Sequence, residues 1–382
     1  MSDRISERPT VRIVAGPAGT DPRRFWGMRA RERLERALAR AGVATGAAGT
    51  VLVRDDFIFD EMLIPALLRQ PGILLTTAAG EPVAAHLADP AQAAAIEPLL
   101  SSGDSKSISG DLQRVDSVGL ASTYNKSLRR RSPPYLLRVD SMPAVAIERQ
   151  MFDGAYKGVT DFVTKRVWPW PAFHVTRLCA GFGISPNLVT AVSLVLVLLA
   201  MWLFWNGQFA LGLACAWGMC FLDTVDGKLA RVTLRSSPFG NVFDHGIDLI
   251  HPPFWYWAWY HGLVVADGGF VDSLLSFSLL VIIVGYVGGR LQEGLFTWLH
   301  GIEIHIWRPL DSWFREITAR RNPNLFILTV AVILGDPREG FVAVAAWTIF
   351  CFAFHTIRIF QASLAKAMGR APVSWLSEPI PS

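Results

Sequence analysis

An uncharged apolar run is the feature that most constrains how this chain can fold. Residues 187–206, NLVTAVSLVLVLLAMWLFWN, contain no Asp, Glu, Lys or Arg. A helix needs about 20 predominantly apolar residues to span a bilayer, and inside lipid only a helix or a closed barrel satisfies the backbone. Ser185 and Pro186 suit the N-cap and first helical positions just before the run. We therefore expect a transmembrane helix here.

Further apolar segments predict a bundle of six transmembrane helices. The other five expected spans are residues 208–222, 249–266, 273–289, 324–335 and 341–357. Lys and Arg gather before the first span and after the second, fourth and sixth, whereas the opposite loops carry almost none. By the positive-inside rule, both termini are then cytoplasmic. We expect an integral protein of the inner or plasma membrane.

The overall composition supports a membrane protein. The chain has 51% hydrophobic and 18% charged residues, against about 25% charged in a typical soluble protein. The formal net charge of +4 is too small to indicate a nucleic-acid partner. The four cysteines form no CxxC pair, so we expect neither a disulfide framework nor a zinc site.

The first part of the chain has a different pattern and predicts a soluble domain. Residues 1–150 alternate short β-like runs with helical segments, which favours a cytoplasmic α/β domain. The expected strands are 11–16 and 50–56, with a strand pair joined by a turn at 80–82, and the expected helices are 23–43 and 60–72. Residues 151–382 then form an all-α membrane domain, which opens with an amphipathic interfacial segment.

Four aspartates interrupt the apolar pattern between the second and third spans. Asp223 and Asp226 are three residues apart, and Gly240, Asp244 and Asp248 follow at intervals of four. Each set therefore lies on one face of a helix. The two helices are joined by a short loop, so we expect them to be antiparallel neighbours whose four carboxylates converge at the cytoplasmic end.

Converging carboxylates point to a divalent-metal site. They repel one another unless cations neutralise them, and hard oxygen ligands suit Mg²⁺, Mn²⁺ or Ca²⁺. Two metals bridged by carboxylates are a known arrangement for phosphoryl displacement. Gly227, Ala230 and Gly240 leave room for a ligand beside the metals, and Arg231 suits phosphate oxygens.

The four aspartates have two alternative interpretations. In the first, the carboxylates pair with Lys228, Arg231 and Arg235 in a salt-bridge network, but three cations cannot neutralise four acids. In the second, they serve a proton or cation transporter. The clustering of all four acids near one membrane face argues against transport.

The spacing of these residues resembles the signature of the CDP-alcohol phosphotransferase family. The pattern is Asp223-x2-Asp226-Gly227-x2-Ala230-Arg231-x8-Gly240-x3-Asp244-x3-Asp248. The resemblance covers roughly residues 155–370. It implies that a CDP-linked donor passes its phosphate-linked group to an alcohol and that CMP leaves.

The same resemblance implies roles for individual residues. The four aspartates would hold two divalent ions, Mg²⁺ or Mn²⁺, and Asp248 is the proposed general base. The cytidine diphosphate pocket would be lined by Gly227, Ala230, Arg231 and Gly240, with Asn187 and Thr190 reaching the nucleotide or only capping and packing the first span. The resemblance also implies a homodimer.

The sequence leaves more than one possible identity for the donor and for the acceptor. We expect CDP-diacylglycerol as the donor, and CDP-inositol or another CDP-polyol is the alternative. A membrane scaffold that keeps the metal site without turnover is the alternative of another class. Candidate acceptor-binding residues, each of which could instead contact solvent or lipid headgroups, are Lys228, Arg235, His245, Arg290 and Arg308.

The N-terminal segment faintly resembles sugar nucleotidyltransferases. Gly16 and Gly19 stand where that family has a glycine-rich loop, and VLVRDDFIFDEML resembles its later strand and acid. No lysine occurs between Ala15 and Gly42, although the family has one there. We expect a degenerate domain without catalysis, the alternatives being an active domain or an unrelated fold.

Overall fold

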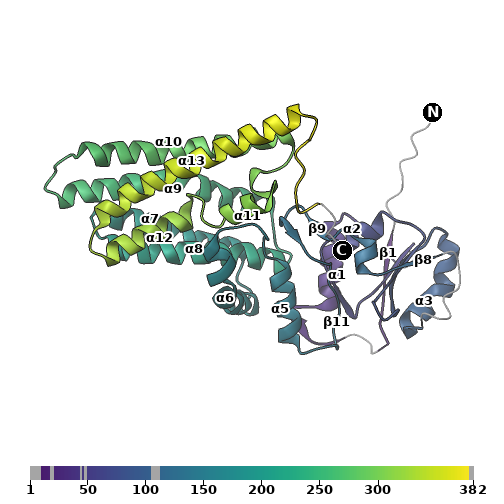
Figure 1. Cartoon of the computed structure of the whole chain (residues 1–382). Coiled ribbons are helices and arrows are strands. Elements are labelled where there is room, and N and C mark those ends of the chain that lie inside the picture. The colour runs from purple at the N-terminus through teal and green to yellow at the C-terminus, as the bar shows by residue number, and fades with distance from the viewer. Residues whose placement is uncertain (1–9, 18–20, 44, 47–49, 105–111, 378–382) are drawn as a thin grey trace. The chain divides into compact units, whose positions relative to one another are not determined.

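The computed structural model describes residues 10–17, 21–43, 45–46, 50–104 and 112–377 (Figure 1). The chain divides into two compact units. The first comprises Met1–Tyr156 with Arg231–Leu234, and the second comprises Lys157–Ala230 with Arg235–Ser382.

A five-stranded mixed sheet forms the centre of the first unit. Its strand order is β1-β4-β7-β6-β8. The outer pairs β1–β4 and β6–β8 are parallel, whereas β7 runs antiparallel to both of its neighbours. The bounds are β1 Val11–Val14, β4 Val51–Arg54, β6 Ile73–Thr76, β7 Pro82–His86 and β8 Gln113–Val115.

Helices cover both faces of this sheet, because its strands are apolar on both sides. Val51 and Val53 pack with Leu34 of α1 (Ala30–Arg40), whereas the intervening Leu52 packs with Ile96 of α3 (Ala93–Ser102). Successive side chains of a strand point to opposite faces, so this alternation gives two hydrophobic layers. The helix α2 (Leu63–Leu68) lies with α1 on the first layer.

The expected helix over residues 23–43 begins too early. The structure starts α1 at Ala30, because Arg24–Phe25 (β2) and Met28–Arg29 (β3) pair as a short hairpin. The turn between them has positive φ at Trp26 (53°) and Gly27 (80°). Residues with positive φ cannot continue a right-handed α-helix, so the helix begins only after this turn.

Smaller elements complete the first unit. Two further strand pairs are antiparallel, β5 with β11 and β9 with β10. The bounds are β5 Phe57–Phe59, β9 Tyr124–Asn125, β10 Arg130–Arg131, β11 Leu136–Arg138, η1 Pro90–Gln92, α4 Ser117–Leu120 and α5 Ala144–Gly154.

The second unit is helical. It opens with a π-helical turn, Val163–Val167, and α6, Pro169–Gly181, within the expected interfacial segment. The helices that follow are α7 Pro186–Trp205, α8 Phe209–Val232, α9 Pro238–Ala266, α10 Ser273–His300, η3 Ile304–Ile306, α11 Pro309–Phe314, α12 Arg321–Ile333 and α13 Pro337–Ala367. Ser185 caps α7 as expected, since its side chain accepts from the amide of Leu188.

The structure supports the expected membrane bundle only in part. Six helices, α7 to α10 with α12 and α13, overlap the six expected spans. Within the described residues, four of them (α7, α8, α10 and α13) are long and apolar enough to cross a membrane. The helix α12 is apolar but shorter. The helix α9 is long but carries aspartates, and it runs through Pro252 and Pro253.

Glycines bring the long helices into close contact. A Cβ on Gly285 of α10 would lie 2.3 Å from a methyl carbon of Thr348 on α13. A Cβ on Gly262 of α9 would lie 2.1 Å from the carbonyl oxygen of Phe204 on α7. Small residues allow helix backbones to approach in this way, and their packing replaces the hydrophobic drive that lipid cannot supply.

A buried polar cluster lies where α10, η3 and α12 meet. The Nε2 of His305 lies 3.2 Å from Oε1 of Glu293, and Arg320 donates to the same carboxylate. Burial lowers the pKa of the His305 imidazole to about 3, although the Glu293 hydrogen bond opposes this shift. His305 is therefore neutral in the folded protein at neutral pH.

We predict that His305 makes the protein less stable in mild acid. An unfolded histidine takes up a proton near pH 6.5, whereas folded His305 does not, so stability should fall as pH drops below that value, by up to about 1.4 kcal/mol per pH unit. In His305→Asn the fall in melting temperature between pH 7.5 and 5 should be smaller, as measured in detergent. The exposed His245 offers the matched control His245→Asn, which should keep the wild-type slope. An unchanged slope in His305→Asn would contradict the assignment.

Candidate metal centre

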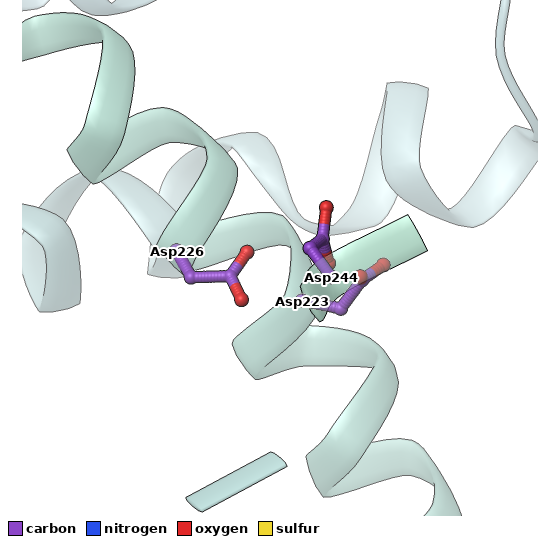
Figure 2. A group of neighbouring side chains, drawn as sticks. All are labelled: Asp223, Asp226 and Asp244. Carbon is purple, nitrogen blue, oxygen red and sulfur yellow. The ribbon is translucent and has the colours of Figure 1, made fainter. Parts of the chain in front are cut away.

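Three of the four aspartates meet at one point. Asp223 and Asp226 of α8 and Asp244 of α9 each offer a carboxylate oxygen, and these oxygens all lie within 4.8 Å of one another (Figure 2). The connection between α8 and α9 is short, with Ser237 as the α9 N-cap. The expected spacing along the helices therefore produces the expected convergence for these three residues.

Asp226 is the most buried of the three, at 3% exposure. Its Oδ2 accepts a 2.6 Å hydrogen bond from the hydroxyl of Thr190 on α7. Its Oδ1 is buried without a hydrogen-bond partner among the described residues. A buried carboxylate oxygen without a hydrogen-bond partner lowers the stability of the fold unless a cation binds to it. The donor set, all hard oxygen atoms, fits Mg²⁺ or Mn²⁺.

The fourth aspartate is held differently. Asp248 of α9 accepts from Nη1 of Arg321, and Nη2 of the same guanidinium donates to Asp223. One arginine at the start of α12 thus bridges α8 and α9. The sequence pattern did not reveal this role, because Arg321 looked like one of several loop cations, and no spacing rule connects it to the aspartates.

The salt-bridge interpretation therefore involved the wrong cation. Arg321, rather than Lys228, Arg231 or Arg235, makes the ion pairs described for the aspartates. A single guanidinium still leaves most of the acidic charge to be neutralised.

The residues after Arg321 anchor the start of α12. Asn322 donates to Asp161 at 2.8 Å, and Asn324 donates to the hydroxyl of Tyr256 at 2.8 Å. Asp161 precedes the π-helical turn, and Tyr256 lies on α9. Burial alone would raise the pKa of Asp161, but Arg315 and the hydrogen bonds from Thr164 and Asn322 outweigh it and lower the pKa. Asp161 is therefore a stable anionic anchor for α12.

Gly240 lies at a close approach between α9 and α7. A Cβ there would be 2.6 Å from Oδ1 of Asn187 and 3.1 Å from the Ser237 hydroxyl oxygen. The Gly240 amide also donates to Ser237 at 3.0 Å. Thr190 and Asn187, the two α7 residues that were expected to reach the nucleotide, therefore both contact the aspartate helices. Thr190 donates a hydrogen bond to Asp226, and Asn187 lies beside Gly240.

The other small residues and Arg231 follow the aspartates along α8. Gly227 and Ala230 are half-buried. Arg231 belongs to the first compact unit, where its Nε donates to the carbonyl of Ala155 at 3.1 Å.

The expected acceptor-binding residues have varied surroundings. Lys228 is buried at 3% exposure. Arg235 donates to the carbonyl of Gly183 at 3.3 Å. His245 is exposed, and its Nδ1 lies 2.9 Å from the carbonyl oxygen of Asn241.

Arg290 and Arg308 are the two candidate acceptor-binding residues beyond the aspartate helices. Arg290 lies 3.6 Å from Glu293 and over the ring of Tyr286, whereas Arg308 lies over the ring of Trp307. Among the described residues, no hydrogen bond or ion pair gives the two arginines a shared partner.

Comparison with known proteins shows which family the region around this site resembles. The CDP-alcohol phosphatidyltransferase family matches residues 183–299, a stretch that contains all four aspartates. Residues 183–299 are therefore similar to a CDP-alcohol phosphatidyltransferase domain, and the relatives that match this chain are named as enzymes of phosphate-group transfer or synthesis.

Individual relatives are distant. The chain is 27% identical over 205 residues to the archaetidylinositol phosphate synthase of Pyrococcus horikoshii, an alignment that covers 52% of this chain and 94% of the relative. It is 28% identical over 168 residues to the bifunctional IPC transferase and DIPP synthase of Rubrobacter xylanophilus, covering 43% and 34%. It is 29% identical over 116 residues to cholinephosphotransferase 1 of Rattus norvegicus, covering 28% and 29%. The matches thus span nearly all of the first relative and about a third of the other two.

We predict that Thr190 positions Asp226. Thr190→Val removes the hydroxyl that donates to the carboxylate and should weaken Mn²⁺ binding about tenfold, because a hydrogen bond to a charged group contributes about 1.5–3 kcal/mol. Thr190→Ser keeps the hydroxyl and should bind Mn²⁺ like the wild type. Titration of the purified protein with Mn²⁺ measures both, and equal weakening in the two variants would instead indicate a packing role.

We also predict that Gly240 cannot accept a side chain. Gly240→Ala places a methyl group against Asn187 and should lower activity at least about tenfold, since small misplacements at a reacting centre are costly. Gly246→Ala is the matched control on the same helix, because a Cβ there has nothing within 4 Å. It should keep full activity. Initial rates of CMP release compare the two, and equal rates would refute the steric argument.

Proposed function

We propose that the chain transfers a substituted phosphate group from a CDP-linked donor to an alcohol and releases CMP. The main support is that carboxylate oxygens of Asp223, Asp226 and Asp244 lie within 4.8 Å of one another. One buried oxygen of Asp226 also has no hydrogen-bond partner among the described residues. Such a cluster is costly without divalent cations and suits phosphoryl chemistry with them.

Each side chain of the site has a role in this proposal. Asp223, Asp226 and Asp244 would hold the metal, with Asp248 completing the set for two ions. Bound Mg²⁺ or Mn²⁺ supplies stabilisation of the negative charge that grows on the CMP leaving group. Thr190 orients Asp226, and the absence of a side chain at Gly240 leaves room beside Asn187 for the nucleotide.

The proton of the acceptor hydroxyl goes to Asp248 in this proposal. Asp248 is the aspartate that lies outside the group of three, and its carboxylate is half-buried. A carboxylate beside the metals but less tightly enclosed suits a general base. Lys228, Arg235, His245, Arg290 and Arg308 remain candidates for the acceptor, and the exposed His245 has its Nδ1 3.8 Å from Asp244.

We propose CDP-diacylglycerol as the donor. Long apolar helices α7 and α8 carry the site residues, so a donor with acyl chains can approach from lipid. The Pyrococcus horikoshii relative is named for the synthesis of archaetidylinositol phosphate. The alternative is CDP-inositol or another CDP-polyol, passed to an inositol phosphate or a lipid alcohol.

The surroundings of the enzyme are part of the same proposal. The apolar helices support an integral membrane protein, and loop charges favour cytoplasmic termini and a cytoplasmic active site in the inner or plasma membrane. A homodimer is proposed from the family resemblance alone.

For the N-terminal domain we propose a fold without nucleotidyl transfer. Asp56, in the segment that resembles the later strand and acid of that family, accepts two hydrogen bonds of 2.9 and 2.6 Å from Arg54, whose side chain is fully buried. A Cβ on Gly16 would lie 2.2 Å from the Asp56 carboxylate, so the loop closes on this ion pair. Gly19 lies outside the described residues.

We predict that CMP release depends on both a metal and the aspartate cluster. Purified protein with Mg²⁺ or Mn²⁺ would be offered CDP-diacylglycerol, CDP-inositol and CDP-glycerol with a panel of alcohols. Asp226→Asn or Asp244→Asn should lower CMP release at least about 100-fold, because each removes a charge that stabilises the metal-bound transition state. Chelation of the metal should do the same to the wild type.

The donors distinguish the alternatives. CMP from CDP-diacylglycerol alone supports the lipid donor, whereas CMP from CDP-inositol alone supports the polyol donor. Absence of CMP with every donor favours the scaffold. The conservative variant Asp267→Asn, in a loop outside the site, is the control and should keep wild-type rates. Rates that persist in Asp226→Asn would refute the metal mechanism.

A further inference from the structure

The guanidinium of Arg321 lies among the carboxylates that the proposed function assigns to divalent ions. It donates to Asp248 with one nitrogen and to Asp223 with the other. Its side chain is 16% exposed. A planar fork of this kind suits two carboxylates and cannot lose its charge, because the arginine pKa is above the physiological range.

The rest of α12 does not depend on Arg321 for its position. Arg320 pairs with Glu293 of α10, Asn322 with Asp161, and Asn324 with Tyr256. Three separate elements thus hold the start of this helix. The Arg321 side chain can therefore swing away from the aspartates while the helix stays in place.

A guanidinium and a metal ion would compete for the Asp223 carboxylate. Asp223 belongs both to the group within 4.8 Å and to the Arg321 ion pair. Asp226 and Asp244 are joined to no arginine in the described hydrogen bonds and ion pairs. An ion held by Asp226 and Asp244 would therefore meet no arginine, whereas an ion that used Asp223 or Asp248 would have to displace Arg321.

We propose that Arg321 is a resident cation that neutralises the aspartate cluster between turnovers and is displaced when the second divalent ion binds. This inference rests on the proposed function only in that the aspartates bind divalent ions. The consequence is that, in the absence of a donor, the second divalent ion binds with lower affinity than the first. The enzyme then has a stable metal-poor state, because four carboxylates are not left facing one another without a counter-charge.

Mn²⁺ binding to the full-length protein in lipid nanodiscs, without any CDP substrate, tests the competition. Free Mn²⁺ would be followed by electron paramagnetic resonance. If the arginine occupies the site about 90% of the time, the apparent affinity for the second ion is reduced about tenfold. Arg321→Gln should therefore bind the weaker Mn²⁺ about tenfold more tightly than the wild type.

Two further variants complete this experiment. Arg320→Gln removes the neighbouring arginine, which pairs with Glu293 rather than an aspartate, and should leave Mn²⁺ affinity unchanged. Arg321→Lys keeps the charge but not the fork and should give an intermediate affinity. Unchanged or weaker Mn²⁺ binding in Arg321→Gln, with Arg320→Gln like the wild type, overturns the proposal.

A measurement on the wild type keeps the test independent of how the variants fold. Phenylglyoxal modifies accessible arginines, and mass spectrometry of peptides locates the adducts. Mn²⁺ should increase the labelling of Arg321 and leave Arg320 unchanged. Labelling of Arg321 that stays constant or falls with Mn²⁺ contradicts displacement. Neither readout involves CMP release, so an inactive protein that shows both effects refutes the transfer reaction but not the displacement.

Discussion

The mutual repulsion of carboxylates inside an apolar helix bundle is the constraint on which this structure depends. Asp223, Asp226 and Asp244 approach within 4.8 Å, and Asp226 is nearly inaccessible to water. Burying such charges costs several kcal/mol each unless opposite charges lie close by. The Thr190 hydroxyl and the Arg321 guanidinium offset part of this cost, and the proposed divalent ions would offset the rest.

The polar start of α12 follows from the same constraint. Residues 320–324, RRNPN, are unusual beside an apolar helix, yet four of the five side chains reach polar partners on other segments. A charged site among helices needs a rigid frame, because long side chains such as arginine lose entropy when they are fixed. The asparagine contacts supply that frame, so the ionic contact of Arg321 can be exchanged without loss of the helix.

Much of this arrangement was predictable from local patterns in the sequence. The intervals between Asp223, Asp226 and Asp244 fixed their helix faces, and the short loop at Ser237 made the two helices neighbours. Strands β1, β4, β6 and β7 followed from apolar runs, whereas the start of the first helix was placed too early because the positive φ at Trp26 is not encoded by a typical turn residue. The Arg321 contact was not predictable, since it links segments far apart in the chain, and a loop arginine is more often solvated.

Two ion pairs in this chain show why the same chemistry has different consequences in its two units. In the first, Arg54 is fully buried against Asp56 and also contacts Glu81 and the carbonyl of Pro82, so its charge is surrounded on every side. In the second, Arg321 keeps some exposure and bridges carboxylates that also face other acids. Removing Arg54 from its partners would leave a buried charge uncompensated, whereas a metal ion can replace Arg321 with a stronger counter-charge. In our proposal the Arg54–Asp56 pair therefore blocks metal binding in the N-terminal domain. The contacts of Arg321 with Asp223 and Asp248 leave a site that a divalent ion can enter.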